Sequence, residues 1–513
     1  MKKAIYISIA LVAIIAGSCK KFLTKIPQSS LSPDNYYNNE SEVNAALAGI
    51  YDVVGAESTW GCRIPVRHNI SNDESWFSYT SFPTGPFWYN YDPSDATVSE
   101  LWKAMYVAIE RANTLLANIG RSDIDSSKRS VAKGEALFLR AFYYFTLVQY
   151  WGDVPLKLEP SASVNNVDIA RAPMKEVYAQ ILADMKEAES RVLTIQQTGN
   201  SGRISKSAVR GILARVCLTM AGEPLKDASR FQEARDWAKK VKDDGYHVLN
   251  PDYKQVFINE CADVEDPKEC IWEAEEYGTN NDAFREGGRM GNENGVKCSS
   301  TVTADVGYCY GFNSATRKLY YLYSAADARR DWAIGNYTLS ATGVKTTMAA
   351  ATIYPRYCAK WRREYEVAYP RNKNYTPTNF PILRYSDVLL MLAEAENEVN
   401  GPSALATESL NLVRRRAGLN DTTIAAADGF RSELRNERAR ELCFEGLRKP
   451  DLVRWGVFLT TMKDVAAEFK TYASSTYQYA ATAAGNVTER HLLYPIPIAE
   501  MSLNKAIKQN PGW

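Results

Sequence analysis

The segment 132–150 (AKGEALFLRAFYYFTLVQY) constrains the fold most strongly, because it has a helical pattern and is apolar on nearly every side. A surface helix keeps a polar face toward water, so a helix without one must be covered by other elements. Gly152 and Pro155 follow in the sequence WGDVP and are expected to end it, since proline cannot continue a helix. The chain is therefore expected to pack several helices around this one, and 513 residues suffice for such a core.

Several other segments also have a helical periodicity. In 101–117 the residues Trp102, Tyr106, Ile109, Asn113 and Leu116 recur at helical spacing and share one face. Further helices are predicted at about 173–193, 205–221, 229–243, 382–399, 404–417 and 431–446. They come in pairs with short breaks, which suits helix–turn–helix repeats of the tetratricopeptide kind, although no strict repeat period is present.

Two stretches lack this periodicity. Residues 55–95 and 245–380 are rich in Gly, Asn, Pro, Tyr and Thr, and long irregular insertions on a helical scaffold are often functional. The expected fold class is therefore mostly α, with a scaffold of tetratricopeptide-like helix pairs at about 36–54, 96–244 and 381–513. The two irregular stretches are expected to be loop-rich, with a few short strands.

Residues 76–91 are unusually rich in aromatic side chains. The eight rings are those of Trp76, Phe77, Tyr79, Phe82, Phe87, Trp88, Tyr89 and Tyr91. Pro83, Gly85 and Pro86 break regular structure, so this segment is predicted to be a loop. Sugar rings have apolar faces that stack on indole and phenol rings, so the loop is a candidate ligand platform. The alternative is a small core that holds a long loop in place.

A second aromatic group lies in the other irregular stretch. It consists of Tyr308, Tyr310, Phe312, Tyr320, Tyr321 and Tyr323. Phenol rings can stack on a ligand and also donate hydrogen bonds. Tyr320 and Tyr321 lie in RKLYYLYS, where packing of a short helix is the favoured interpretation.

The sequence lacks the motifs of zinc sites, catalytic triads and phosphate-binding loops. Its three histidines, His68, His247 and His491, form no zinc or triad motif, and neither a CxxC pair nor a phosphate-binding glycine motif is present. Asp92 and Asp95 do not have EF-hand spacing and favour a solvated turn. We therefore expect no metal, no cofactor and no catalysis. A net charge of +1 also argues against a nucleic-acid partner.

Charged residues alternate in sign along 437–454. Arg438 and Glu441 are three positions apart and share a helix face, and Glu445, Arg448, Asp451 and Arg454 continue the pattern. We interpret these side chains as a structural lattice of ion pairs that joins this helix to its neighbours.

The N-terminus has the features of an export signal. Lys2 and Lys3 precede an apolar stretch at 4–16, which is too short to span a bilayer, and AGSC then ends at Cys19. We predict a signal peptide at 1–18, acylation of Cys19, and a tether at 19–35. The alternative is ordinary secretion with Cys19 incidental.

The other eight cysteines are compatible with disulfides in an exported protein. The pairs Cys261/Cys270 and Cys298/Cys309 are locally spaced, but the sequence leaves their connectivity open. Cys217 and Cys443 lie in helical patterns and favour buried thiols.

Residues 436–456 (NERARELCFEGLRKPDLVRWG) resemble the signature of the SusD/RagB family. Other matching segments are 134–156 (GEALFLRAFYYFTLVQYWGDVPL), 382–401 (ILRYSDVLLMLAEAENEVNG), 410–419 (LNLVRRRAGL) and 494–513 (YPIPIAEMSLNKAIKQNPGW). The resemblance implies a single SusD-like domain at 36–513, in which tetratricopeptide-like helix pairs support a variable, ligand-facing region. It also implies a non-catalytic lipoprotein of the outer membrane that faces outward. Such a protein would capture oligosaccharide for a TonB-dependent, SusC-like transporter.

The expected ligand site combines stacking rings with polar groups. Trp60, Trp76, Trp88 and Tyr89 are expected to stack on sugar, with Tyr308 and Tyr310 completing the arc, and Arg67, Asp73 and Asn90 are expected to orient it by hydrogen bonds. This expectation follows from the resemblance, because starch-binding members of the family stack sugar on an aromatic arc with Arg, Asp and Asn nearby. Three alternatives stay open: peptide capture of the RagB kind, a glycoside hydrolase with paired carboxylates, and a protein-binding adaptor, which predicts a buried aromatic loop.

Overall fold

The computed structural model describes residues 36–121, 123–163, 165, 167–280, 287–299, 306–340 and 342–513. The predicted signal peptide, the acylated Cys19 and the tether all fall in 1–35, outside the described residues. The fold is mostly α, as expected.

The N-terminal half is a series of helices, and each long helix packs on the next long helix in the sequence. They are α2 (Glu40–Gly55), α3 (Ala96–Asn118), α4 (Ser126–Trp151), α5 (Met174–Arg191), α6 (Ile195–Thr198), α7 (Lys206–Ala221) and α8 (Arg230–Asp243). Side-chain caps fix several starts: Asp95 accepts from the Val98 amide and Ser205 from the Ala208 amide. The helices predicted at 101–117, 173–193, 205–221 and 229–243 are thereby confirmed, within a few residues at their ends.

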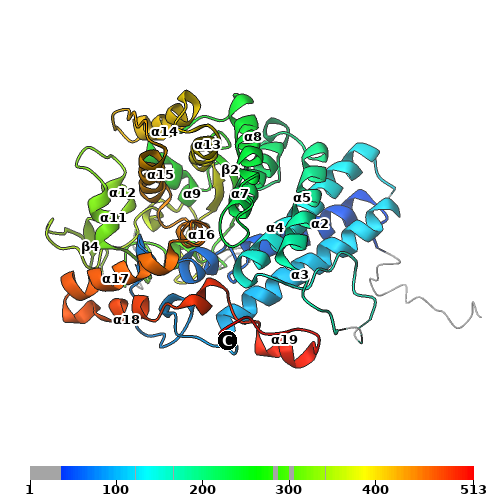
Figure 1. Cartoon of the computed structure of the whole chain (residues 1–513), viewed down its shortest axis with the longest axis horizontal. Coiled ribbons are helices and arrows are strands. Elements are labelled where there is room, and N and C mark those ends of the chain that lie inside the picture. Colours follow the sequence, from blue (N-terminus) through cyan, green and yellow to red (C-terminus); the bar gives the residue numbers. More distant parts are fainter. Residues whose placement is uncertain are drawn as a thin grey trace, which may run out of the picture.

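Helix α4 is the buried central helix that its sequence predicts. Its residues are buried almost continuously from 134 to 151, and α2, α3 and α5 all pack on it. It ends at Trp151, where Gly152 has a φ of +71° that favours glycine. Figure 1 shows α2 to α5 together at one end of the molecule, followed by α7 and α8.

The C-terminal half continues the helical layer. Its helices are α13 (Tyr385–Asn400), α14 (Ala404–Arg416), α15 (Ala427–Leu442), α16 (Arg448–Arg454), α17 (Phe458–Tyr472), α18 (Tyr479–Gly485) and α19 (Ile498–Leu503). Helix α13 packs on α8 from the first half and on α14 and α15 (Figure 1). The helices α17 and α18 lacked a recognised sequence signal. They form a second core cluster with Trp76 and Tyr89.

The middle region, residues 245–384, contains short elements, as its irregular sequence predicts. Its helices are α9 (Tyr253–Ala262), α10 (Met290–Glu293), α11 (Arg317–Leu322) and α12 (Arg330–Ala333). Its strands are β2 (Cys270–Ala274), β3 (Asn313–Ala315), β4 (Tyr337–Leu339), β5 (Lys345–Thr347) and β6 (Phe380–Arg384), and β1 (Ser75–Phe77) lies in the first irregular stretch. The remaining turns are η2 (Ile64–His68), η3 (Pro86–Trp88), η4 (Ile119–Arg121), η5 (Arg363–Tyr365), η6 (Ser475–Tyr477) and η7 (Glu489–Leu492).

The described strands form three antiparallel pairs, of which β1–β3 and β2–β6 join segments far apart in the sequence. Strand β1 pairs with β3 in the register Ser75↔Ala315 and Phe77↔Asn313, β2 pairs with β6, and β4 pairs with β5. The β1–β3 pair matters most for function, because it joins the two irregular stretches, 55–95 and 245–380. The two aromatic segments recognised in the sequence are thereby adjacent in space.

The predicted ion-pair lattice is confirmed, and it is deeply buried. Glu441 pairs with Arg329, Arg384 and Arg416, and all four side chains are at most 3% exposed. On the neighbouring turns Arg438 bridges Asp387 and Asp451. The signature segment therefore ties α13, α14 and α15 to the middle region.

All eight cysteines in the described residues are buried, free thiols. Cys298 and Cys309 face each other across an isolated antiparallel bridge and exchange two backbone hydrogen bonds, but their thiols form no disulfide.

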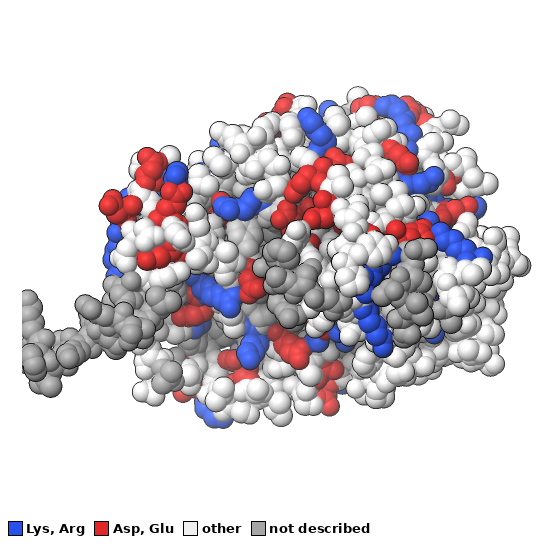
Figure 2. All heavy atoms as spheres, turned by 180° about the vertical axis from the view of Figure 1, so that it is seen from behind, with Lys and Arg blue, Asp and Glu red and all other residues white. Residues whose placement is uncertain are grey.

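None of the helices in the described ranges is long and apolar enough to cross a bilayer. Acidic and basic side chains are interspersed over the face shown in Figure 2, in keeping with the balanced net charge.

Candidate functional site

Two of the predicted stacking residues lie in the core and offer no free ring face. Trp60 is 7% exposed and stacks on Phe142 of α4, with ring centroids 4.6 Å apart. Trp76 is 2% exposed, contacts Phe469 of α17 and donates its indole N–H to the Ala315 carbonyl. Both predictions as sugar-stacking residues are wrong, because helices that the sequence places far away cover these rings.

Trp88 and Tyr89 are buried for a related reason. The turn at Gly85 and Pro86 folds the loop back on itself, so that Trp88 packs edge-on against Phe77 and donates its indole N–H to the Phe82 carbonyl. Tyr89 is 1% exposed and donates its hydroxyl to the Ser71 carbonyl. These two rings are therefore also structural, and in this part of the loop they form the small core that holds a long loop in place.

Asp73 is a structural ion-pair residue rather than a ligand contact. It is 3% exposed, both its oxygens lie 2.7 Å from Arg448, and Lys318 adds a third contact. Although burial alone raises a carboxyl pKa, the two cations keep the pKa of Asp73 well below its ordinary value. Its hydrogen-bonding capacity is used within the protein, which corrects the prediction.

The neighbouring Glu74 has the opposite electrostatic behaviour. Burial raises its pKa to about 8, and its carboxyl accepts only the Phe444 amide among the hydrogen bonds described. Between pH 4.5, its ordinary value, and pH 8 the folded protein holds a proton that the unfolded chain releases. The contribution of Glu74 to stability therefore falls as pH rises through this window.

The Glu74→Gln variant is expected to lack this loss. Relative to wild type it should gain on the order of 5 kcal/mol of unfolding free energy between about pH 4.5 and 8, since each of the roughly 3.5 pKa units between these values is worth about 1.4 kcal/mol. Urea denaturation across this pH range measures the difference. Glu159→Gln, at an exposed position, is the control. Parallel pH profiles for wild type and Glu74→Gln would contradict the buried, protonated carboxyl.

Four partly exposed aromatic side chains, two from each irregular stretch, gather on one surface. We call Tyr79, Phe82, Tyr308 and Tyr310 the ring cluster. Tyr310 contacts Tyr308 and Tyr79 edge-on, with centroids 4.9 and 5.8 Å apart, and Tyr79 lies 5.6 Å from Phe82. The buried ring of Phe312 supports Tyr79, Phe82 and Tyr310 from below. Phe82 is 36% exposed, so this surface has ring area available for a ligand.

Arg67 borders the ring cluster and is held in place from behind. It comes from the π-helical turn η2, and its guanidinium forms a bidentate pair with the buried Glu293 at 2.8 and 3.3 Å. It also lies over Phe82, 5.2 Å from the ring centroid. Arg289, Arg63 and Glu57 extend this edge as further paired charges. A planar, fixed donor beside stacked rings suits recognition of a hydroxyl-bearing ligand.

Of the remaining predicted ligand residues, Tyr308 lies in the ring cluster and Asn90 lies outside it. Lys373 lies 4.9 Å above the Tyr308 ring and adds a cation to the opposite edge. Asn90 is exposed, and its backbone pairs with Gly85, but in the described part of the chain no side-chain hydrogen bond links it to the ring cluster. The structure thus brings together Arg67, Tyr308 and Tyr310, while Asn90 stands apart.

Tyr79 and Phe82 are not among the ligand residues that the sequence predicts, yet both lie in the ring cluster. Strand alternation is the sequence signal that separates Tyr79 from the buried Trp76, since successive side chains of a strand point to opposite faces. Trp76 enters the α17–α18 core, whereas Phe77 and Tyr79 both contact Phe312 on the other side.

One group of side chains has the composition of a metal site. Glu260, Cys270 and Glu273 are buried with their donor atoms within 4.8 Å of one another, and Glu273 also lies in a second group with Glu265 and Glu275. Burial raises the pKa of Glu260 and of Glu273, so both favour protonation, and Cys270 donates to Glu273 at 2.9 Å. A cation would have to displace these protons.

A cavity of about 750 Å³ lies elsewhere, between α4, α16 and the C-terminal segment, and none of the nine predicted ligand residues lines it. We favour the ring cluster as the primary site because it combines exposed rings with a fixed guanidinium.

Two family models match the chain. Residues 268–513 match the model described as the SusD family, and residues 21–218 match the model described as starch-binding, associating with the outer membrane.

Similar proteins extend over nearly the whole chain. SusD-like protein P25 of Formosa agariphila is 24% identical, with 96% of this chain and 95% of that protein covered. A SusD homolog of Bacteroides thetaiotaomicron, known from a crystal structure, is 29% identical with a TM-score of 0.87, covering 94% of this chain and 98% of its own. Surface glycan-binding protein A of the same organism, in complex with laminarihexaose, is 21% identical with a TM-score of 0.71, covering 92% and 100%.

Proposed function

Because the chain belongs to the SusD/RagB family, we propose that it captures oligosaccharide at the cell surface and delivers it to a TonB-dependent, SusC-like transporter. In this proposal Cys19 carries the lipid anchor in the outer membrane. The protein binds its cargo and releases it unchanged.

The observation that carries the proposal is the ring cluster with Arg67 at its edge. Apolar C–H faces of a sugar would lie on Tyr79, Phe82 and Tyr310, and the Arg67 guanidinium would donate to hydroxyl oxygens. The rings hold one another edge to face over Phe312, so little side-chain freedom is lost on binding. Modest affinity would suffice, because an adjacent transporter raises the effective concentration of the cargo.

The adaptor hypothesis is disfavoured by the exposure of part of the aromatic loop. It predicts a buried aromatic loop, and Trp76, Phe87 and Trp88 are indeed buried. Phe82 and Tyr79, however, reach the surface next to two tyrosines from the other irregular stretch. A cluster assembled from two distant loops at the surface favours a ligand site.

The proposal is tested by calorimetric titration of mature protein with a panel of β- and α-glucans and other glycans, laminarihexaose included. We expect saturable binding to at least one glycan, and chromatography should recover that glycan intact. Turnover of the bound glycan would contradict the non-catalytic role. Failure of all glycans, together with capture of peptides from a peptide library, would replace the proposal with peptide uptake.

A further inference from the structure

A cavity of about 750 Å³ opens at the surface where α4, α5, α7, α16 and the C-terminal segment meet. Its walls are mainly apolar and include Tyr150, Tyr178, Phe458 and Tyr494, while Glu489 and Arg490 are exposed at its rim. This volume is in the range of cavities that bind small organic ligands.

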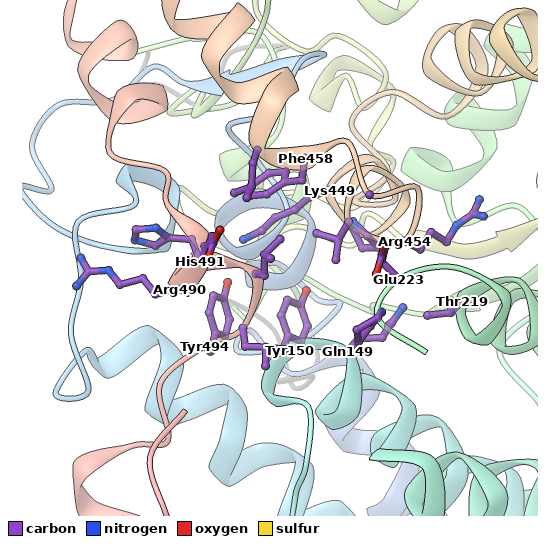
Figure 3. A pocket seen from close by; sticks show the side chains of 18 of the residues that line it. Gln149, Tyr150, Thr219, Glu223, Lys449, Arg454, Phe458, Arg490, His491 and Tyr494 are labelled. Atoms are coloured by element: carbon purple, nitrogen blue, oxygen red, sulfur yellow. The ribbon is translucent and has the colours of Figure 1, made fainter. Parts of the chain in front are cut away.

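The side chain of Lys449 points into this cavity, toward the hydroxyl ends of Tyr150 and Tyr494 (Figure 3). Lys449 is 5% exposed. Its ammonium donates to the His68 carbonyl at 3.3 Å and lies 5.1 and 5.2 Å from the ring centroids of Tyr89 and Tyr494.

The other cations of the same helix are neutralised, whereas Lys449 is not. Arg448 makes a bidentate pair with Asp73, and Arg454 makes one with Glu394, at 2.6 and 2.7 Å. In the described ranges no carboxylate forms an ion pair with Lys449, and burial alone lowers its pKa to about 7.

The ionisable groups nearest to Lys449 do not supply the missing negative charge. Burial lowers the pKa of His491 to about 4 and that of His68 well below its ordinary value, so both rings are neutral at pH 7. A buried cation without a counter-charge is costly unless a ligand provides one.

We propose that this cavity binds a small amphiphilic anion, with an apolar aromatic or aliphatic body against Phe458, Tyr150 and Tyr494 and one carboxylate or sulfonate paired with Lys449. This site is separate from the ring cluster. It would give the protein a second ligand class in addition to the glycan.

Two fluorescent probes that differ in one charged group test the proposal. They are 8-anilinonaphthalene-1-sulfonate and its uncharged counterpart N-phenyl-1-naphthylamine, titrated at about pH 6, where the amine is protonated. Wild-type protein should bind the sulfonate saturably at one site. Lys449→Met should weaken binding of the sulfonate about 10-fold or more, because a charge-assisted contact is lost. It should change the affinity for the neutral probe by less than about 3-fold, because the apolar walls remain.

Two further variants complete the experiment. Lys463→Met removes an exposed lysine of α17 and should leave both probes unchanged. Leu459→Trp adds bulk to the cavity lining and should weaken both probes, with the melting temperature reporting on folding. Equal sulfonate affinity in wild type and Lys449→Met, or indifference of both probes to Leu459→Trp, would overturn the proposal.

Discussion

Replacing Glu441 with glutamine is expected to lower the free energy of unfolding by about 3–5 kcal/mol, because it leaves buried cations without their counter-charge. Glu441 is 0% exposed and is shared by Arg329, Arg384 and Arg416. These three arginines keep the pKa of the Glu441 carboxyl well below its ordinary value against the opposing effect of burial. The carboxylate therefore contributes stability above its ordinary pKa of 4.5, and this contribution is lost as pH falls.

Urea denaturation at pH 7 measures the effect of Glu441→Gln. The control is Glu408→Gln, which breaks a pair with Arg415 in which both side chains are more than two-fifths exposed. Solvent screens such a pair, so the control should cost less than about 1 kcal/mol. If Glu441→Gln cost no more than this control, the signature segment would not be the structural lattice that we describe.

Tyr310→Ala is expected to weaken binding of the best glycan about 10-fold or more while leaving the fold intact. A stacking ring at the centre of a site contributes more than about 1.4 kcal/mol, and Tyr310 is only partly buried. Trp76→Ala is expected to do the reverse. It should cost about 3–5 kcal/mol of stability, because its 2% exposed ring packs against Phe469, and it should leave the affinity of folded protein unchanged.

Calorimetric titration measures the glycan affinity of each variant, and urea denaturation measures its stability. Tyr369→Ala, which removes a 60% exposed tyrosine outside the ring cluster, is the control for affinity. Loss of affinity in Trp76→Ala with wild-type affinity in Tyr310→Ala would place the ligand in the α17–α18 core and contradict our assignment.

The helical scaffold was predictable because its signals are local. The apolar periphery of α4, its end at Gly152 and the caps at Asp95 and Ser205 act within a few residues. The alternating charges around Arg438 predict that an ion-pair lattice forms. They do not predict that Arg329 pairs with Glu437 or that Arg384 pairs with Glu441, because these arginines come from the middle region. No local pattern identifies such partners.

The site was predictable only in part, because exposure is a tertiary property. Composition located the aromatic loop correctly, yet Trp76 and Trp88 became core when α17 and α18 covered them. The indole rings of Trp76 and Trp88 offer a large area for stacking, and that same area makes tryptophan strongly buried on average. Lys449 lay within a recognised motif, but nothing in the sequence distinguishes it from Arg448, whose carboxylate partner comes from a loop far away along the chain.

The most direct measurement of the central claim is a crystal structure of mature protein with its best-binding glycan. We predict a sugar ring in contact with Tyr79 and Tyr310 and a hydroxyl oxygen within hydrogen-bonding distance of the Arg67 guanidinium. A glycan found in the Lys449 cavity, with the ring cluster bare, would contradict it.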